Sequence, residues 1–198
     1  QVIDSLKGHY ANRVKVDDSI HNKMMAYLRE YMVVGGMPSV VNCFLATNNF
    51  GLVHQEQEKI TAAYLNDIAK YADNTEKPKV RSCFLSIPRQ LAKENTKFQY
   101  SIVERNGTSR KFANALEWLR DAGIVTYCNN LSTLQFPLSA YAKEDQFRIY
   151  MGDIGLLVSM YGFEMKAALL ENTLAGPAKG GIFENLMADI LHKKHFPL

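Results

Sequence analysis

The sequence predicts a mainly α-helical protein with a small β-hairpin, in which a helical bundle precedes a winged helix-turn-helix. Apolar residues recur at the three- and four-residue spacing of amphipathic helices along most of the 198 residues. A β-pattern directly follows the amphipathic helix predicted for Ser109–Asp121, and helices followed by a two-stranded wing are typical of a winged helix-turn-helix. Positive charge gathers in the same region, because nine Lys and Arg but only two Glu lie between Lys77 and Lys111.

Three helices are predicted in the first part of the chain. The first begins at the N-cap residues Asp17-Asp18-Ser19 and ends near Val34. Gly35-Gly36-Met37-Pro38 then predicts a tight corner, since Gly suits the position past a helix end and Pro suits the next first turn. An anion held at the N-terminus of the next helix is the alternative use of this corner. The two further helices are Pro38–Ala46, with Val40, Val41, Phe44 and Leu45 buried, and Leu52–Ala72.

The polar segment Asp73–Pro78 is the clearest linker and is expected to separate two domains. Beyond it, Val80–Ser86 predicts an apolar helix with basic residues between the apolar ones. Pro88 is expected to begin another short helix, Arg89–Glu94, because proline is tolerated at the first helical position. The β-branched and aromatic residues of Phe98–Val103 predict a short strand or an extended connector.

The next helix, Ser109–Asp121, is the best defined by its pattern, and Gly123 ends it. A β-hairpin is expected to follow, in which Ile124–Cys128 pairs with Thr133–Phe136 around Asn129-Asn130. The buried stripe of the helix consists of Phe112, Ala115, Leu116 and Leu119.

The last part of the chain contains one strand pattern and two helices. Phe147–Met151 alternates like a strand, and Asp153 is expected to cap a short apolar helix, Ile154–Met160. Ala175–Gly181 predicts a flexible loop before the last helix, Ile182–His195. The aligned apolar residues of that helix are Phe183, Leu186, Met187, Ile190 and Leu191. The chain is therefore predicted to divide into residues 1–76, 77–160 and 161–198.

Composition favours a cytoplasmic protein without a membrane partner. The three cysteines are far apart, which is typical of free thiols in a reducing compartment. The sequence holds no apolar run of the roughly 18 residues that span a bilayer, and no signal-peptide pattern. The chain begins at Gln1 without an initiator Met and ends soon after an apolar helix. We therefore expect a piece of a longer protein, whether natural, proteolytic or engineered.

The basic segment Lys77–Lys111 has two interpretations. It contacts nucleic-acid phosphates, with duplex DNA as the partner, or it is a solvated face or a docking surface for an acidic partner domain. The residues expected to face a DNA groove are Ser109, Arg110, Lys111 and Asn114, because such helices read bases with their N-terminal turn. The remaining members of the predicted nucleic-acid-binding set are Arg89, Lys93 and Lys97.

The sequence shows no catalytic constellation and no metal site. No phosphate-binding loop of the form Gly-x-x-x-x-Gly-Lys-Ser/Thr occurs. Asp67 is expected on a partly exposed helix face. Glu184 opens the last helix but has no neighbouring carboxylates, which metal-dependent hydrolysis requires. His192 and His195 lie one helical turn apart without a visible third ligand.

Several motifs occur in an order that resembles a known family. They are Tyr31-Met-Val-Val-Gly-Gly-Met-Pro38, Tyr64-x-x-Asp67-Ile68, Ser86-Ile-Pro-Arg-Gln-Leu91, Lys97-Phe98-x-Tyr100-Ser101, Trp118-Leu119 with Gly123, Asp153-x-Gly155-Leu156-Leu157 and Gly181-x-Phe183-Glu184-Asn185. Together they resemble the region after the nucleotide-binding core in a family of bacterial and archaeal AAA+ ATPases, which are P-loop NTPases. In that family a winged helix is followed by a restriction-endonuclease-like domain of unknown function. The similarity covers about residues 22–190.

The resemblance implies a structural identity for each of the three segments. Residues 1–76 would be lid-like helices, 77–160 the winged helix, and 161–198 a linker and the first helix of the C-terminal domain, onto which Glu184 maps. The Walker motifs would precede Gln1, so this chain is not expected to be an enzyme or to hold a cofactor. ATP and Mg would bind elsewhere in the parent protein.

The expected function is therefore regulation or recognition for an attached ATPase core, through contact with DNA or with a partner domain. One rival is a standalone winged-helix transcription regulator that binds DNA and dimerises through its N-terminal helices. The other rival is a pure protein-interaction module. The sequence leaves the oligomeric state and the pathway open.

Overall fold

The computed structural model describes residues 2–95 and 97–196 of the chain. Within these residues the two strands form one antiparallel pair, and helices make up most of the rest. The predicted fold class, mainly α with a small β-hairpin, is confirmed. The elements are α1 Val2–Asn12, α2 Asp18–Val34, α3 Pro38–Thr47, α4 Phe50–Tyr71, α5 Lys77–Leu91, α6 Tyr100–Val103, α7 Ser109–Asp121, β1 Val125–Leu131, η1 Leu138–Tyr141, β2 Ala142–Met151, α8 Ile154–Met160, α9 Phe163–Leu170 and α10 Pro177–Lys193.

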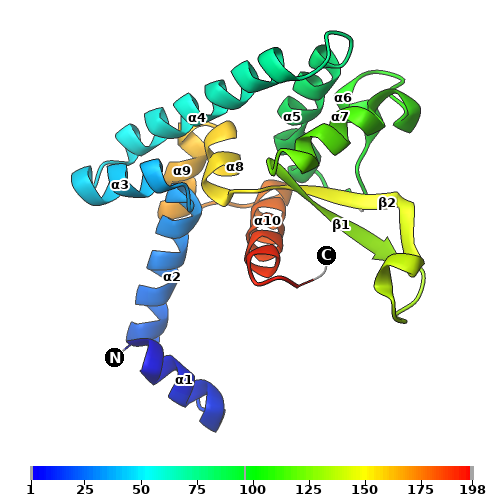
Figure 1. Ribbon diagram of the computed structural model, residues 1–198. Coiled ribbons are helices and arrows are strands. Elements are labelled where there is room, and N and C mark those ends of the chain that lie inside the picture. Colours follow the sequence, from blue (N-terminus) through cyan, green and yellow to red (C-terminus); the bar gives the residue numbers. More distant parts are fainter. Residues whose placement is uncertain (1, 96, 197–198) are drawn as a thin grey trace.

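The long helix α4 connects two halves of the molecule (Figure 1). Helices α2, α3, α8 and α9 lie at one end, whereas α5, α6, α7 and the β1–β2 hairpin lie at the other. Helix α10 packs against α5, α8 and both strands, and so contacts elements of both halves. Helix α1 points away from the body, with Ile3 and Tyr10 exposed. None of the described helices combines the length and the apolar composition needed to cross a membrane.

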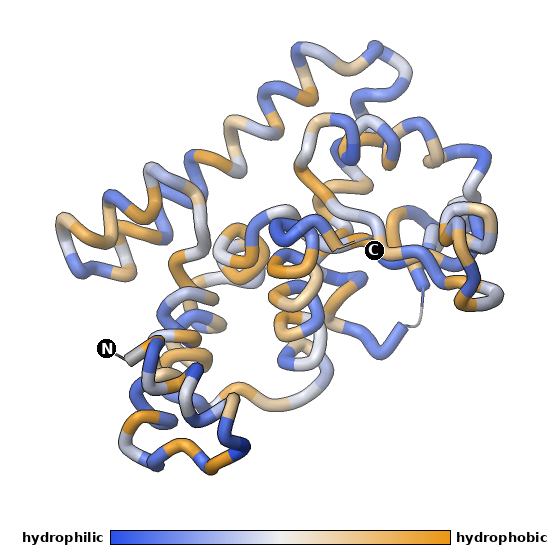
Figure 2. Tube along the Cα trace, turned by 60° about the horizontal axis from the view of Figure 1, so that its bottom comes forward, coloured by the Kyte–Doolittle hydropathy of each residue, from blue (hydrophilic) through white to orange (hydrophobic). Residues whose placement is uncertain are grey.

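One hydrophobic core joins the two halves. It includes Met32 of α2, Ile68 of α4, Phe84 of α5, Leu157 of α8 and Leu186 of α10, all buried. Hydrophobic and hydrophilic residues alternate along the helices in Figure 2, as amphipathic elements around a shared core require. The core continues across the two predicted domain boundaries, and those boundaries stay predictions.

The strongest helical patterns were predicted correctly. Helix α7 has the predicted bounds, and its four stripe residues are buried. Helices α2, α3 and α8 begin and end within about two residues of their predicted positions. Two local details differ. Leu45, expected to be buried, is 76% exposed on α3, and Asp17 makes no side-chain cap bond at the start of α2. Helix α9 was not predicted.

Pro88 does not begin a new helix, contrary to the prediction. It lies inside the single helix α5, which continues to Leu91. Proline removes one helical hydrogen bond, but Ile87, Pro88 and Leu91 are all buried in the core. The carbonyl of Pro88 also accepts a hydrogen bond from the Tyr161 hydroxyl at 2.8 Å. Packing therefore stabilises the helix beyond the residue at which the local pattern predicts a break.

The segment predicted as a strand or connector, Phe98–Val103, is extended only at its start. The backbone N–H of Phe98 donates to the carbonyl of Phe147 at 2.7 Å, and α6 follows immediately. The side-chain amide of Gln90 bonds both the N–H and the carbonyl of Gln99, at 3.0 and 2.8 Å. This side chain satisfies the two backbone groups that a continuing strand would have paired.

The second strand of the hairpin was predicted at the wrong position. Strand β1 pairs with Ala142–Met151, in a register that places Val125 opposite Met151 and Cys128 opposite Arg148. Asn129 and Asn130 lie in the strand and not in a turn. Strand β2, which pairs with β1, buries Phe147, Ile149 and Met151. The segment 133–136, by contrast, has no side chain facing the core. Local sequence favours the nearest β-pattern, but burial of one sheet face decides the pairing.

The last helix begins earlier than predicted and presents a different face to the core. Helix α10 begins at Pro177, so residues 177–181 are helical and not a loop. Gly181 packs directly on the backbone of Leu91, where a β-carbon would collide with the carbonyl oxygen. Ile182, Leu186, Asn185 and Asp189 are buried, whereas Met187, expected in the buried stripe, is 53% exposed.

A fully buried lysine connects α9 to the end of α2. The Lys166 side chain is 0% exposed, and its ammonium donates to Oε1 of Gln57 in α4. Nε2 of Gln57 donates in turn to the carbonyl oxygens of Val33 and Val34, both at 2.9 Å. Burial lowers the pKa of Lys166 from 10.5 to about 8, because the charged form loses its hydration. The network therefore joins three helices through one amide.

Lys166 makes the stability of the fold depend on pH in the alkaline range. Between pH 8 and 10.5 the unfolded chain binds a proton that the folded chain has lost. The free energy of unfolding should therefore rise with pH across this window, by on the order of 3 kcal/mol. Urea denaturation of the wild type and of Lys166→Met in parallel measures this effect, because other titrating groups act on both proteins. A difference between the two that does not change with pH would contradict the prediction.

Candidate functional site

The N-terminal turn of α7 is exposed, as the DNA interpretation requires. Ser109, Arg110, Lys111 and Asn114 all face solvent. The ammonium of Lys111 forms an ion pair with Glu104 at 2.6 Å. Arg110 makes no ion pair in the described part of the chain, so its guanidinium is the group best placed to contact a ligand here.

The other predicted nucleic-acid contacts lie near the end of α5 and beside α7. Arg89 is exposed on α5, and Lys93 follows it by four residues. Lys93 lines a cavity of about 410 Å³ together with Arg148 and Glu184. The structure brings Lys97 to Ser109 in a second cavity, of about 440 Å³.

The groove between α7 and the hairpin is lined by aromatic rings, by three carboxylates (Glu117, Glu144 and Asp145) and by two cations, Lys97 and Arg120. Glu144 lines both the cavity that holds Lys97 and an adjoining one of about 400 Å³ beside Glu117. Asp145 lies in the first of them, and neither Glu144 nor Asp145 has an ion pair within the described residues. A phosphate that followed α7 toward the hairpin would therefore meet Glu144 and Asp145 as well as the cations of the groove.

Aromatic rings form the wall of the same groove. The rings of Tyr127 and Phe147 stack with their centroids 4.9 Å apart, and the Phe98 ring continues the stack at 6.0 Å from Phe147. The guanidinium of Arg120 lies over Tyr127 at 5.4 Å from the ring centroid. Burial raises the pKa of the Tyr127 hydroxyl, so it stays neutral. The wall is therefore a rigid, uncharged surface that fixes the hairpin against α7.

The loop of the hairpin is uncharged and apolar at its tip. Residues 132–141 contain no Lys, Arg, Asp or Glu. Leu134 is 86% exposed and Phe136 is 89% exposed. Large apolar side chains at such a tip are typical of a contact with another protein.

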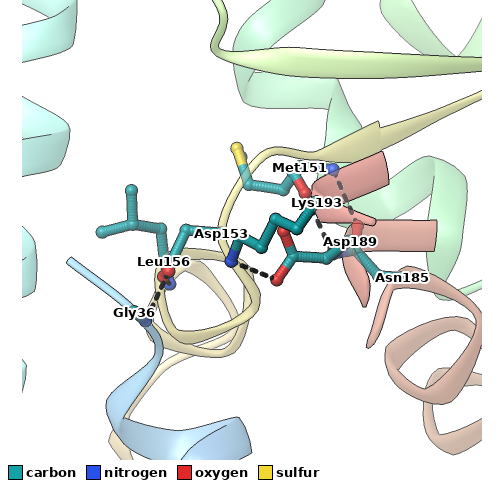
Figure 3. Close-up of polar contacts among 7 residues, drawn as sticks. All are labelled: Gly36, Met151, Asp153, Leu156, Asn185, Asp189 and Lys193. Carbon is teal, nitrogen blue, oxygen red and sulfur yellow. Dashed lines mark hydrogen bonds and ion pairs between the residues drawn. The ribbon is translucent and has the colours of Figure 1, made fainter. Parts of the chain in front are cut away.

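A buried polar hub lies where α8, α10 and the corner between α2 and α3 meet (Figure 3). The Asp153 carboxylate, 3% exposed, accepts hydrogen bonds from the backbone N–H of Gly36 at 2.7 Å and of Leu156 at 2.9 Å. The second bond confirms the predicted N-cap of α8. The first ties that cap to the corner between α2 and α3, a contact that no local pattern predicts.

Glycines allow the backbone of the α2–α3 corner to approach the start of α8 closely at this hub. Gly35 has a φ of +78°, which favours glycine, and its N–H donates to the Tyr31 carbonyl at 2.7 Å. A β-carbon on Gly155 would lie 2.5 Å from the carbonyl oxygen of Val34. The structure thus supports the interpretation of Gly35-Gly36 as a tight helix–helix corner.

Helix α10 contributes the rest of the hub. The Asn185 side chain accepts from the N–H of Met151 at 2.7 Å and donates to its carbonyl at 3.1 Å. Asp189 forms an ion pair with Lys193 at 2.8 Å. Burial raises the pKa of Asp189, although the hydrogen bond from Lys193 opposes this. The side chains of the hub are paired with backbone groups or with an ion-pair partner. Such pairing is typical of a contact that stabilises the fold.

The remaining candidate residues are not brought together. Glu184 is exposed and pairs with Arg148 at 2.8 Å, whereas His192 and His195 are exposed at the end of α10. Asp67 is exposed on α4. The described residues contain no group of three His, Cys, Asp or Glu side chains arranged to hold a metal ion.

Sequence reasoning missed the residues that shape these surfaces. Glu144 and Asp145 belong to a strand that was not predicted at their position, so their place beside α7 could not be inferred. Asp189 and Lys193 are spaced i, i+4, which is a recognisable ion-pair signal on a helix. No pattern in the sequence indicated that Leu134 is exposed, because this residue was assigned to a predicted strand.

A family model described as a domain of unknown function (DUF8612) matches residues 25–167. The matched part includes α7, the hairpin and Asp153, and it ends before α10. No curated protein and no solved structure matches the chain.

The hub makes a direct prediction for stability. Asp153→Ala leaves the N–H groups of Gly36 and Leu156 without an acceptor and removes the cap of α8, so it should cost about 2–4 kcal/mol. Urea denaturation measures the loss. The exposed Asp145→Ala is the matched control and should change the free energy of unfolding by less than about 0.5 kcal/mol. Equal effects of the two substitutions would show that Asp153 is not essential to the joint.

Proposed function

The chain belongs to the family described as a domain of unknown function (DUF8612), and from its geometry we propose that it is a non-catalytic recognition module that docks on a partner protein domain. The docking unit is the segment from α5 to β2, which we interpret as a winged helix. Helices α5, α6 and α7 precede one hairpin, in the order typical of that motif. Helix α7 packs on α5 and on β1, which supports the interpretation.

The observation that carries the proposal is the apolar tip of the hairpin. Leu134 and Phe136 are exposed in a loop without charges. A wing that follows a DNA backbone needs Lys or Arg to neutralise phosphates, whereas protein interfaces are built around apolar and aromatic anchors. Glu144 and Asp145 beside α7, which have no ion pair within the described residues, favour a protein partner for the same reason.

The proposed partner is the attached nucleotide-binding core of a AAA+ ATPase. This part of the proposal rests on the sequence motifs that resemble that family. The parent protein would then bind ATP and Mg in the core, and this chain would transmit or restrict its movements. A cytoplasmic location is proposed with it, supported by the three free cysteines.

The second candidate function is duplex DNA binding. The observation that favours it is the exposed N-terminal turn of α7, which presents Ser109, Arg110 and Asn114. DNA would have to approach α7 from its N-terminus and avoid Glu144 and Asp145. The contact area would then be small, so weak and salt-sensitive binding is expected.

The docking proposal is tested by removing the apolar anchors. The chain is mixed with the separately expressed nucleotide-binding core of a AAA+ ATPase from the family that the motifs resemble. Calorimetry should show binding, and the double variant Leu134→Ser/Phe136→Ser should weaken it by at least about tenfold, because two apolar side chains are no longer buried. The matched control is Tyr71→Ser, on an exposed aromatic residue of α4. Unchanged affinity of the double variant would contradict the docking surface.

The DNA candidate is tested with random duplex DNA across a salt series. If α7 contacts several phosphates, a micromolar affinity at about 50 mM salt should fall steeply by about 200 mM. Arg110→Glu should remove most of this binding, because it replaces the unpaired cation of the turn. An affinity that Arg110→Glu leaves unchanged, or the absence of binding at low salt, would exclude this function for α7.

A further inference from the structure

A cavity of about 320 Å³ lies in the corner between α2 and α3 and plays no part in the proposed docking surface. Three aromatic side chains line it, Tyr27, Tyr31 and Phe44. Glu30 contributes the single carboxylate of the lining, and Gly36 forms part of its floor. No lysine or arginine lines it.

The positions of these residues follow from helix periodicity. Tyr27, Tyr31 and Val34 recur at i, i+4 and i+7, which places them on one face of α2. Phe44 belongs to α3, and its ring stacks on Phe50 with the centroids 5.1 Å apart. The corner at Gly35-Gly36 directs α3 away from α2, so the two aromatic faces diverge and leave the cavity between them.

Charges of both signs surround the cavity. Glu30 has no ion pair or hydrogen bond in the described part of the chain. A β-carbon on Gly36 would lie 3.6 Å from Oδ2 of Asp153 and 3.5 Å from Nζ of Lys193. Burial raises the pKa of Tyr31, although the Lys193 ammonium lies close enough to lower it. Outside the lining, the ammonium of Lys23 already lies 5.8 Å from the centroid of the Tyr27 ring.

We propose that this cavity binds a trimethylammonium group carried on a short neutral chain. Aromatic faces attract a cation through their quadrupole, and a quaternary ammonium is the cation that combines positive charge with an apolar surface. The methyl groups would contact Tyr27, Tyr31 and Phe44, and the charge would be balanced by Glu30. A strongly hydrated ion such as Mg²⁺ would need several oxygen ligands, which this lining does not provide.

The cavity volume of about 320 Å³ accommodates a trimethylammonium group on a slender chain. Two sources carry the same chemistry, a small metabolite such as choline and a trimethylated lysine side chain of a protein. Both present three methyl groups on nitrogen at the end of a slender chain. The experiment therefore uses a probe for each source.

The first probe is choline, with 3,3-dimethylbutan-1-ol as its neutral isostere of the same shape. Titration of the full chain is followed by NMR shifts of the tyrosine ring protons. Choline should bind and move two tyrosine signals, and the isostere should bind at least about tenfold more weakly, because it lacks the charge that the rings and Glu30 attract. Equal binding of the two compounds, or no binding of choline, would overturn the proposal.

Substitutions of the lining residues test whether choline binds in this cavity. Glu30→Gln and Tyr27→Leu should each weaken choline binding by about threefold to tenfold. Tyr27 is half exposed, so its replacement leaves the core intact. Tyr71→Leu is the matched control, since Tyr71 is an exposed tyrosine beside a lysine, with the ammonium of Lys70 4.8 Å from its ring centroid, but it lies outside the cavity. A loss of binding in Tyr71→Leu equal to that in Tyr27→Leu would overturn the assignment.

The second probe is a short neutral peptide that contains trimethyllysine, compared with the same peptide containing unmodified lysine. Tighter binding of the trimethylated peptide than of choline identifies a modified protein as the source. Binding of choline that the peptide does not exceed identifies a small metabolite. Stronger binding of the unmodified lysine peptide would contradict the preference for a quaternary ammonium.

Discussion

The carboxylate of Asp153 is the interaction on which the architecture depends. It accepts backbone hydrogen bonds from Leu156, in the first turn of α8, and from Gly36, which lies 117 residues before Asp153 in the sequence. A buried carboxylate is costly unless donors surround it, so the corner between α2 and α3 must stay against the first turn of α8. Gly35 and Gly155 allow the two backbones to approach that closely. Asn185 then fixes α10 to the end of β2 in the same region.

The hub and the shared core occupy the centre of the molecule, where the buried Asp153 and Asn185 hydrogen-bond to backbone groups and Asp189 pairs with Lys193. The free surfaces lie at the periphery, where the apolar hairpin tip extends from one half and the aromatic corner opens in the other. Folding places Lys97 beside Ser109 at the start of α7 with Glu144 in the same cavity, whereas Lys93 lines another cavity with Arg148 and Glu184. The number of basic residues in a sequence segment therefore does not by itself give the charge of a surface.

Local chemistry accounts for the parts of the fold that were predictable. Helix α7 combines a complete apolar stripe with a terminating Gly123, and its bounds and burial were predicted without error. The cap at Asp153 and the corner at Gly35 were predictable for the same reason, since each depends on neighbouring residues. The exposure of Arg110 and Asn114 followed from the same periodicity. The opposing acids of β2 could not be predicted, because their position depends on a strand pairing between distant segments.

Local sequence patterns are enough to predict helices α2, α3, α4, α7 and α8, the Asp153 cap of α8, and a strand directly after α7. These properties depend on hydrogen bonds and side-chain contacts within a few residues. Contacts that form only on folding establish that α5 continues through Pro88, that β1 pairs with residues 142–151 and that α10 buries Asn185 and Asp189 in place of Met187. In each case burial against a distant element outweighs a local preference of a few kcal/mol or less. The sequence cannot reveal such contacts, because the partner residues are adjacent only after the chain has folded.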